Sequence, residues 1–283
     1  MPLMKAVRRA KKSIDLVVFR FDRVELEKAL AAAVTRGVMV RVLIAHTNGG
    51  GEKLLRKLEQ RLLGAGVTVT RTADDLPRYH GKMTLVDDTL YVTGFNYTRL
   101  DIEKSRSFGL ITRDRKLFKE AAALFEADST RQPYTPGDRR LVVSPETSRE
   151  RLSAFIGKAR KELLIYDDRL SDKLMLRLIR ERIEAGVEIR VIGRVEKDID
   201  GVASAKLSDM RLHVRAIVRD GASVFLGSQS LRKPELDERR EIGVIVNDAP
   251  MARKMKAVFE ADWRLAKGPN KEANEALTVT AAG

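Results

Sequence analysis

The chain has 283 residues, of which 43% are hydrophobic, enough for one large domain or two of ordinary size with a substantial core. It contains no cysteine, which excludes disulfides, thiol catalysis and zinc–thiolate sites, and its three histidines are too few for a histidine-rich metal cage. Lys and Arg outnumber Asp and Glu by 54 to 40, and the formal charge of +14 attracts polyanions such as nucleic acid, anionic lipid headgroups or phosphorylated metabolites. Aromatic residues make up only 5%, so a surface of base-stacking rings is not expected.

The chain carries neither an apparent membrane span nor a secretion signal. No stretch approaches the ~18 consecutive apolar residues that a transmembrane helix needs. Residues 1–12 pass directly into a basic segment without the apolar core of a signal peptide. We therefore expect a cytoplasmic protein, whose basic surface could contact an anionic membrane peripherally.

The predicted elements of the first half are repeated in the second at a constant spacing. In each half a helix end leads into a buried strand, then an amphipathic helix, then a glycine and another strand; the segments are 10–18, 24–35 and 36–43 in the first half and 159–166, 172–184 and 185–192 in the second. Gly37 and Gly186 occupy the position just past a helix end, where glycine accepts the left-handed conformation. The chain is therefore expected to be an internal repeat.

The two halves differ in one inserted segment and one strand. The first half has extra residues after its second strand, including the glycine-rich stretch 47–53, which opens a helix running to Leu63. This stretch lacks the Gly-Lys-Ser/Thr ending of a phosphate loop, so we interpret it as a plain flexible connection. The apolar strand 141–143 has no counterpart in the first half, which suggests that the N-terminus is trimmed or naturally short by one strand.

The predicted organisation follows from this repeat. The breaker-rich stretch 131–137 marks the seam, giving an N-terminal half over 1–132, a C-terminal half over 141–266 and a flexible tail over 267–283. Strands that alternate with helices argue for an α/β fold in each half, a mixed sheet flanked by helices. Two similar halves usually pack about a pseudo-twofold axis, which brings equivalent positions face to face.

The chemistry-bearing feature is a pattern His-x-Lys/Arg-x4-Asp that occurs once in each half. The first copy begins at His80 and the second at His213, so two of the three histidines fall in the same repeated pattern. If each copy is a strand, the histidine and the cation two residues later point to one face: His80 with Lys82, and His213 with Arg215. The aspartates that end the copies, Asp87 and Asp220, stand at hairpin turns.

These residue types suit transfer at phosphorus without a metal or other cofactor. One imidazole can attack phosphorus to form a phosphohistidine, while a second protonates the leaving alcohol. The two cations can neutralise the non-bridging oxygens, on which negative charge builds in the transition state. Arginine can hold two such oxygens at once, whereas lysine acts as a point charge.

The doubled motif resembles the phospholipase D superfamily over nearly the whole chain. Residues 93–98, Thr-Gly-Phe-Asn-Tyr-Thr, are most similar to the cardiolipin synthase branch, and residues 227–230, Gly-Ser-Gln-Ser, resemble the superfamily's Gly-Ser-x-Asn. The resemblance implies that both histidines share one active site between the halves. It assigns catalysis to His80, Lys82, His213, Arg215 and Glu241, support of the motif to Asp87 and Asp220, and phosphate binding to Asn96, Ser228 and Ser230.

The sequence departs from the family pattern at three positions. Arg215 stands in place of lysine, Ser230 in place of asparagine, and Ser107 in place of the glutamate that orients a motif histidine. Glu241 matches that glutamate in the second half, so the pattern predicts a carboxylate partner for His213 and none for His80. Family habit favours the first-half histidine as the nucleophile, whereas Glu241 favours His213, and the sequence leaves the assignment open.

Three functions are compatible with this pattern. The leading one is a phosphodiesterase or phosphatidyltransferase that acts on a phospholipid headgroup ester through a phosphohistidine. A metal-independent endonuclease of the same superfamily is the second, favoured by the charge of +14. The third is a catalytically degenerate module that binds phosphate-rich partners, suggested by the substitutions at Ser107, Arg215 and Ser230. No cofactor is expected for any of them.

Overall fold

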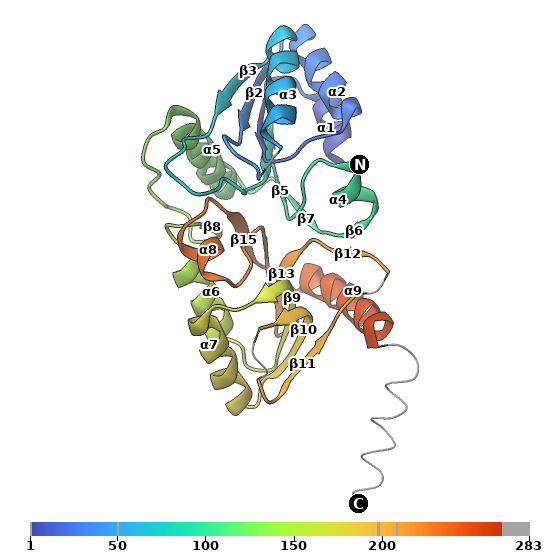
Figure 1. Ribbon diagram of the computed structural model, residues 1–283, viewed down its shortest axis with the longest axis vertical. Helices are drawn as coiled ribbons and strands as arrows, with labels where there is room; N and C mark the ends of the chain where they lie inside the picture. Colours follow the sequence, from blue (N-terminus) through green and yellow to red (C-terminus); the bar gives the residue numbers. More distant parts are fainter. Residues whose placement is uncertain (1, 50, 197–198, 208, 268–283) are drawn as a thin grey trace, which may run out of the picture.

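The computed structural model describes residues 2–49, 51–196, 199–207 and 209–267 and shows two α/β lobes stacked along the long axis of the molecule (Figure 1). The elements of the first lobe are α1 (Pro2–Arg9), β1 (Ser13–Val18), α2 (Val24–Thr35), β2 (Met39–Ile44), α3 (Glu52–Gly64), β3 (Thr68–Arg71), β4 (Met83–Val86), β5 (Thr89–Thr93), α4 (Arg99–Glu103), β6 (Ser105–Arg106), β7 (Gly109–Thr112) and α5 (Arg115–Thr130).

The second lobe follows a similar order, with an additional strand at its start and, within the described residues, no helix equivalent to α3. Its elements are β8 (Leu141–Val143), α6 (Ser148–Gly157), β9 (Glu162–Leu170), α7 (Lys173–Glu184), β10 (Glu188–Val195), β11 (Val202–Ala205), β12 (Arg211–Leu212), β13 (Arg215–Arg219), β14 (Ser223–Gly227), α8 (Lys233–Asp237), β15 (Ile242–Asn247) and α9 (Ala249–Lys267).

The two main sheets have equivalent topologies, which confirms the predicted α/β repeat. The first has the order β3-β2-β1-β4-β5-β7 and the second β11-β10-β9-β13-β14-β15-β8. Three strands run parallel in each sheet, β1 to β3 in the first and β9 to β11 in the second, and the hairpin beside them is antiparallel. Within the described residues, β8 has no counterpart in the first sheet, as the sequence indicated.

Local signals in the sequence account for the helix boundaries. The predicted helix 24–35 coincides with α2, and α7 begins directly after Asp172, whose side chain accepts hydrogen bonds from the backbone N–H groups of Leu174 and Met175. Gly37 and Gly186 both adopt φ +82°, which confirms their predicted role at helix ends. The predicted tail, 267–283, lies outside the described residues except for Lys267, which ends α9.

The lobes share a hydrophobic core and exchange backbone hydrogen bonds. The core cluster of the first lobe continues into the second through residues such as Leu141, Tyr166 and Phe259. The N–H groups of His80 and Gly81 both donate to the carbonyl oxygen of Arg240, at 2.7 and 2.9 Å. In the equivalent contact, His213 donates to the carbonyl oxygen of Arg106 at 3.1 Å, next to the pairing of β12 with β6.

These cross-lobe bonds change one expectation about the motifs. The sequence predicted strands that begin at the histidines, but β4 begins at Met83 and β13 at Arg215. The backbone at His80 and His213 bonds to the opposite lobe instead of continuing its own sheet. Both histidines therefore lie at the interface between the lobes.

Candidate active site

His80 lies against the second lobe and is paired with Glu241. Its Nδ1 atom is 2.9 Å from Oε2 and 3.2 Å from Oε1 of that carboxylate. The Glu241 side chain is fully buried, and that of His80 is 15% exposed. When Glu241 is ionised it can only accept a hydrogen bond, so the contact then places the proton on Nδ1 of His80 and leaves Nε2 with a free lone pair.

This pairing corrects the sequence interpretation of Glu241. We expected this residue to orient His213 in its own half, and we expected His80 to lack a carboxylate. Both expectations are wrong, because Tyr79 and Arg240 form a parallel bridge between the lobes and bring the following residues, His80 and Glu241, side by side. The glutamate thus serves the histidine of the opposite half.

Lys82 is the buried cation of the first motif. It is 1% exposed, and its Nζ atom donates to the carbonyl oxygen of His80. Nζ lies 5.4 Å from the centroid of the Phe19 ring, and the same ring packs edge-on against the His80 imidazole at 4.7 Å. Phe19 therefore fixes the positions of both motif side chains.

His213 has its own carboxylate, supplied by Asp101 of α4 in the first lobe. Its Nδ1 atom is 3.4 Å from Oδ2 of Asp101, close enough for an ion pair but without hydrogen-bond geometry. Both side chains are nearly buried, at 9% and 3% exposure. Each motif histidine consequently faces a carboxylate from the opposite lobe.

Asp101 is held in place by three further groups. Its Oδ2 atom accepts from the backbone N–H and from the side-chain amide of Asn96, at 2.8 and 2.7 Å, and its Oδ1 atom accepts from Arg211 at 2.6 Å. Ser107, which stands at the position equivalent to Glu241, donates to the backbone carbonyl of Asp101. The amide of Asn96, predicted to bind phosphate, is thus bonded to Asp101 here.

Arg215, the cation of the second motif, is paired with an acidic residue that the sequence reasoning did not select. Its guanidinium donates to Oδ1 of Asp168 at 2.6 Å, and the Asp168 side chain remains 41% exposed. Neighbouring Asp167 is buried and accepts from the Ser230 hydroxyl and from the backbone N–H of Leu231.

The two serines predicted to bind phosphate are both buried. Ser228 accepts from the backbone N–H of Ile242, beside Glu241, and Ser230 is bonded to Asp167. A phosphate-binding role for either serine stays a prediction.

The motif aspartates accept backbone hydrogen bonds at equivalent places in the two lobes, and their motif-supporting role stays a prediction. The carboxylate of Asp87 accepts backbone hydrogen bonds from Lys11, Lys12 and Ser13, where β1 begins. Asp220 does the same for residues 160–162 at the start of β9. Both adopt a positive φ, 52° and 53°, in hairpin turns at the end of the sheet opposite the histidines.

With this geometry in place, comparison with known proteins identifies the family. A family model described as "Cardiolipin synthase, PLD-like domain" matches residues 3–129 and 152–263. This chain belongs to the phospholipase D superfamily. Among curated proteins, the mitochondrial cardiolipin hydrolase of Homo sapiens is 36% identical over 118 residues, covering 40% of this chain and 43% of that protein.

Further relatives support this family and its fold. The Mus musculus mitochondrial cardiolipin hydrolase is 32% identical over 148 residues, covering 49% of this chain, so the match spans at most 63% of the length of these two relatives. A polyphosphate kinase from Porphyromonas gingivalis superposes with a TM-score of 0.76 at 21% identity, over 93% of this chain and 48% of the other. A phosphatidylserine synthase from Haemophilus influenzae gives 0.70 at 11%, over 99% and 90%. At these identities both structures show the fold alone.

Burial and neighbouring cations set the protonation of this phospholipase D-like site. Burial lowers the pKa of His80 well below its ordinary value, and the charges of Lys82 and Arg215 lower it further. Burial also lowers the pKa of His213, an effect that Asp101 opposes. Without an anion in the site, both imidazoles are therefore neutral at pH 7.

The same effects bring the pKa values of Lys82 and Glu241 to about 7. Burial lowers the pKa of Lys82 to about 7, despite the opposing charge of Glu241. It raises the pKa of Glu241 to about 7, opposed chiefly by Lys82. Charged groups of each motif thus influence the pKa values of the other motif.

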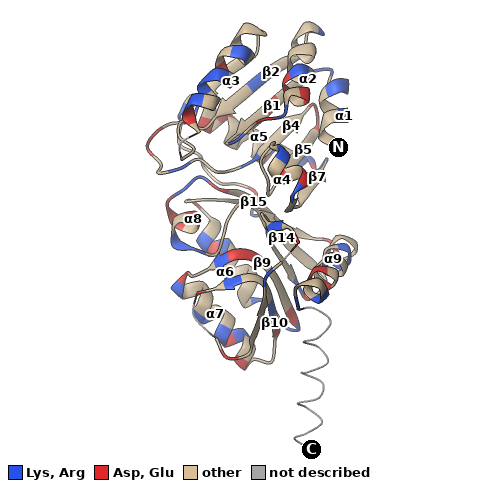
Figure 2. Ribbon diagram, turned by 45° about the vertical axis from the view of Figure 1, so that its right-hand side comes forward, with Lys and Arg blue, Asp and Glu red and all other residues tan. Residues whose placement is uncertain are grey.

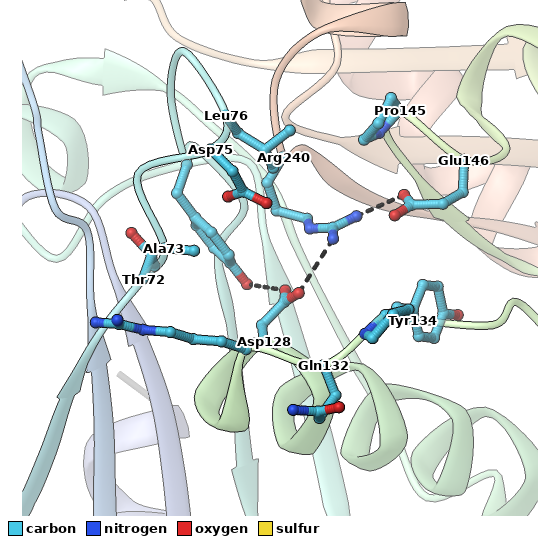
Figure 3. A pocket seen from close by; sticks show the side chains of 13 residues that line it. Thr72, Ala73, Asp75, Leu76, Asp128, Gln132, Tyr134, Pro145, Glu146 and Arg240 are labelled. Carbon is cyan, nitrogen blue, oxygen red and sulfur yellow. Dashed lines mark hydrogen bonds and ion pairs between the residues drawn. The ribbon is translucent and has the colours of Figure 1, made fainter.

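Next to the first motif lies a buried network that joins the lobes. Figure 3 shows Arg240 between Asp128 and Glu146, and Asp128 also accepts a hydrogen bond of 2.7 Å from the Tyr79 hydroxyl. These residues line a cavity of about 360 Å³. The lining of this cavity includes Tyr79 and Arg240 but neither of the residues that follow them, His80 and Glu241.

Two further properties concern metals and membranes. Within the described ranges, no group of three or more His, Asp or Glu side chains has the arrangement needed to hold a metal ion. None of the described helices combines the length and apolar character required to cross a membrane. The predicted absence of a cofactor and the predicted cytoplasmic location stay predictions.

Sequence reasoning missed two acidic residues of the site, Asp101 and Asp168. Asp101 lies three residues after Thr98, whose hydroxyl accepts from its backbone N–H, so its local pattern is that of a helix start. Asp168 lies at the end of a buried strand, where the first half has Phe19. Neither has a spacing that points to a histidine, and only the packing of the lobes reveals their roles.

Proposed function

We propose that this protein breaks or exchanges phosphodiester bonds by a two-step mechanism with His80 as the nucleophile and His213 as the general acid and base. The observation that carries the proposal is the convergence of both imidazoles, each facing a buried carboxylate of the opposite lobe, with the cations Lys82 and Arg215. His80 is assigned as the nucleophile because its contact with Glu241 has hydrogen-bond geometry, whereas the contact of His213 with Asp101 does not.

In the first step, Nε2 of His80 attacks phosphorus and the bond from phosphorus to the leaving alcohol oxygen breaks. His213 gives that oxygen its proton, and Lys82 with Arg215 neutralises the non-bridging oxygens. In the second step, the oxygen of water or of an acceptor alcohol attacks phosphorus, His213 takes its proton, and the bond to His80 breaks. Binding of the phosphate anion favours the protonated form of His213 that the first step requires.

A phospholipid is the proposed substrate class. A cavity of about 310 Å³ extends from the His213 partner Asp101 to the leucines Leu54 and Leu100, which are 70% and 52% exposed. A cavity lined by both charged and exposed apolar side chains fits an amphiphile. The names of the cardiolipin hydrolase relatives and of the family model agree with this class.

A nuclease is the second candidate, and the charge of +14 favours it. Figure 2 shows Lys and Arg on helices of both lobes, interspersed with acidic residues. Turnover of phosphatidylglycerol vesicles and of single-stranded DNA, each with a metal chelator, separates the two candidates. We expect chelator-resistant turnover of the lipid. A strict requirement for magnesium would contradict the mechanism, and turnover of neither substrate would favour a binding module.

The assignment of the two histidines is tested with an activated leaving group. Nitrophenolate departs without a proton, so bis(nitrophenyl) phosphate needs the nucleophile but not the general acid. We expect His80→Ala to abolish turnover of both this substrate and the lipid. His213→Ala should lose about 10²- to 10⁴-fold on the lipid and retain release of nitrophenolate in the first turnover. The reverse pattern would exchange the two roles.

A further inference from the structure

A cavity of about 420 Å³ in the second lobe is lined by cations and by no carboxylate. Five of its lining residues are basic: Arg139, Arg140, Arg151, Lys158 and Arg219. Arg219 ends β13, whereas Arg215 of the second motif begins that strand and His213 precedes it. This basic cavity therefore lies at the end of the sheet opposite the candidate active site and is separate from it.

Contacts between its lining side chains hold the basic cavity together. Arg151, Phe155 and Lys158 are spaced four and three residues apart along α6 and its C-terminal end, so they share one face of that helix. The guanidinium carbon of Arg219 lies 4.3 Å from the centroid of the Phe155 ring, and its Nη1 atom donates to the Phe155 carbonyl oxygen at 3.0 Å. Arg151 donates to two backbone carbonyl oxygens of the segment 138–141. Cations from a helix, a strand and the segment between the lobes thus line one cavity.

Three of the five cations have no carboxylate partner. Among the described residues, no carboxylate lies within ion-pair distance of Arg151, Lys158 or Arg219, while the other two cations are paired with carboxylates that do not line the cavity. Burial lowers the pKa of Arg151 and of Arg219, opposed for Arg219 by the charge of Asp220. Arg151 is only 8% exposed, so its charge is held largely away from water. An anion from outside the chain would balance these charges.

The first lobe shows that the repeated fold does not require this arrangement. In the repeat, Val86 stands at the position of Arg219, directly before the motif aspartate. Ala6 stands at the position of Phe155, so the ring over which Arg219 packs also has no equivalent. The basic cavity is therefore an addition of the second lobe and not a part of the frame that the two lobes share.

We propose that the basic cavity binds a soluble compound with a diphosphate group, at a site distinct from the catalytic centre. A diphosphate monoester carries about three negative charges at pH 7, which match the three unpaired cations. The volume of about 420 Å³ is in the range of small-molecule sites. None of the exposed large hydrophobic side chains in the described part of the chain lines this cavity, which favours a soluble ligand over a lipid in a membrane.

The test is calorimetry at constant ionic strength with adenosine diphosphate as the probe. We expect the wild-type protein to bind it, and Lys158→Gln and Arg219→Gln each to weaken the affinity about 10-fold through the loss of one charge-assisted contact. Lys158 is exposed, so its variant should fold normally and checks the result for Arg219, which also bonds to the backbone. Arg9→Gln is the matched control, because Arg9 is exposed and stands at the position of Lys158 in the first lobe. Its affinity should equal that of the wild type.

Each contrary outcome overturns a specific part of the proposal. No binding to the wild type, or an affinity unchanged in both cavity variants, would overturn the site, and equal weakening in Arg9→Gln would attribute binding to overall charge. Weakening in His80→Ala that Lys158→Gln does not share would place the ligand in the catalytic centre. Phosphatidylglycerol vesicles or single-stranded DNA that bind through Lys158 and Arg219 more tightly than adenosine diphosphate would overturn the assignment to a soluble small ligand. Because binding requires no turnover, the result does not depend on the proposed function.

Discussion

The two histidine centres arise from the same repeated motif but obtain their carboxylates from different places. His80 faces Glu241, which directly precedes β15 and bonds to its Nδ1 at 2.9 Å. His213 faces Asp101 in the short helix α4, at 3.4 Å and without hydrogen-bond geometry, while the position equivalent to Glu241 holds Ser107. The repeat therefore preserves the histidines and varies the way in which their partners are supplied.

The cations of the two motifs also differ in their burial and in their bonding partners. Lys82 is buried and bonded to the carbonyl of His80, whereas Arg215 is held by the partly exposed Asp168. Phe19 occupies the corresponding position beside Lys82. The cation of the first centre is therefore bonded to the backbone, whereas the cation of the second is bonded to a carboxylate. This contrast fits a nucleophile at His80 and a proton carrier at His213.

Glu241→Gln is expected to lower activity more than the equivalent change in the other centre. The amide keeps the size of the side chain but removes the charge that fixes the tautomer of His80, so kcat should fall about 100-fold. Glu241→Asp should recover part of the loss, and the melting temperature should change much less than the activity in either variant. A loss of kcat no greater than that of Asp101→Asn would contradict the assignment of His80 as the more strongly oriented imidazole.

Asp101→Asn tests the weaker contact and should lower kcat about 10-fold, because the carboxylate influences His213 through charge more than through a hydrogen bond. Ser107→Glu in the same chain restores the carboxylate at the position that Glu241 occupies in the other half. We expect this double variant to regain several-fold of the lost activity in steady-state assays. If Ser107→Glu gives no recovery, the two lobes do not supply carboxylates interchangeably.

Lys82→Arg tests the centre that contains His80 through the pH dependence of its activity. With a pKa of about 7, Lys82 carries its charge below that pH and loses it above, so kcat/KM of the wild-type enzyme should decline as the pH rises through 7. Arginine stays charged throughout, and the decline should move to higher pH in the variant. A profile whose alkaline limb is unchanged would exclude Lys82 as its source.

Asp168→Asn tests the centre that contains Arg215 and has the smallest expected effect on the kinetics. Without the carboxylate, Arg215 is free to bind phosphate, so KM should fall about threefold while kcat changes little. Initial-rate measurements over a range of substrate concentrations distinguish the two parameters. A raised KM would mean that Asp168 positions Arg215 for the substrate instead of competing with it.

The sequence was sufficient for the fold, because the same helix ends, glycines and buried strands recur in both halves. It also selected both histidines and both cations, since the same spaced pattern occurs once in each half. It failed on the partners of the histidines. The sequence pattern pairs Glu241 with the histidine of its own half, and Asp101 resembles an ordinary helix start after Thr98. Such contacts depend on how two lobes pack, which the local pattern of neither lobe records.

The backbone bonds from His80 and Gly81 to Arg240, and from His213 to Arg106, bear on how the protein can be divided. Each lobe supplies the carboxylate that faces the other's motif histidine, so a chain cut within residues 131–140 should yield two fragments that are inactive alone and regain activity when mixed. Two copies of the chain that exchange lobes would likewise contain two complete centres. Assembly of the site is thus a matter of molecular recognition between halves, and the covalent link between them mainly raises their local concentration.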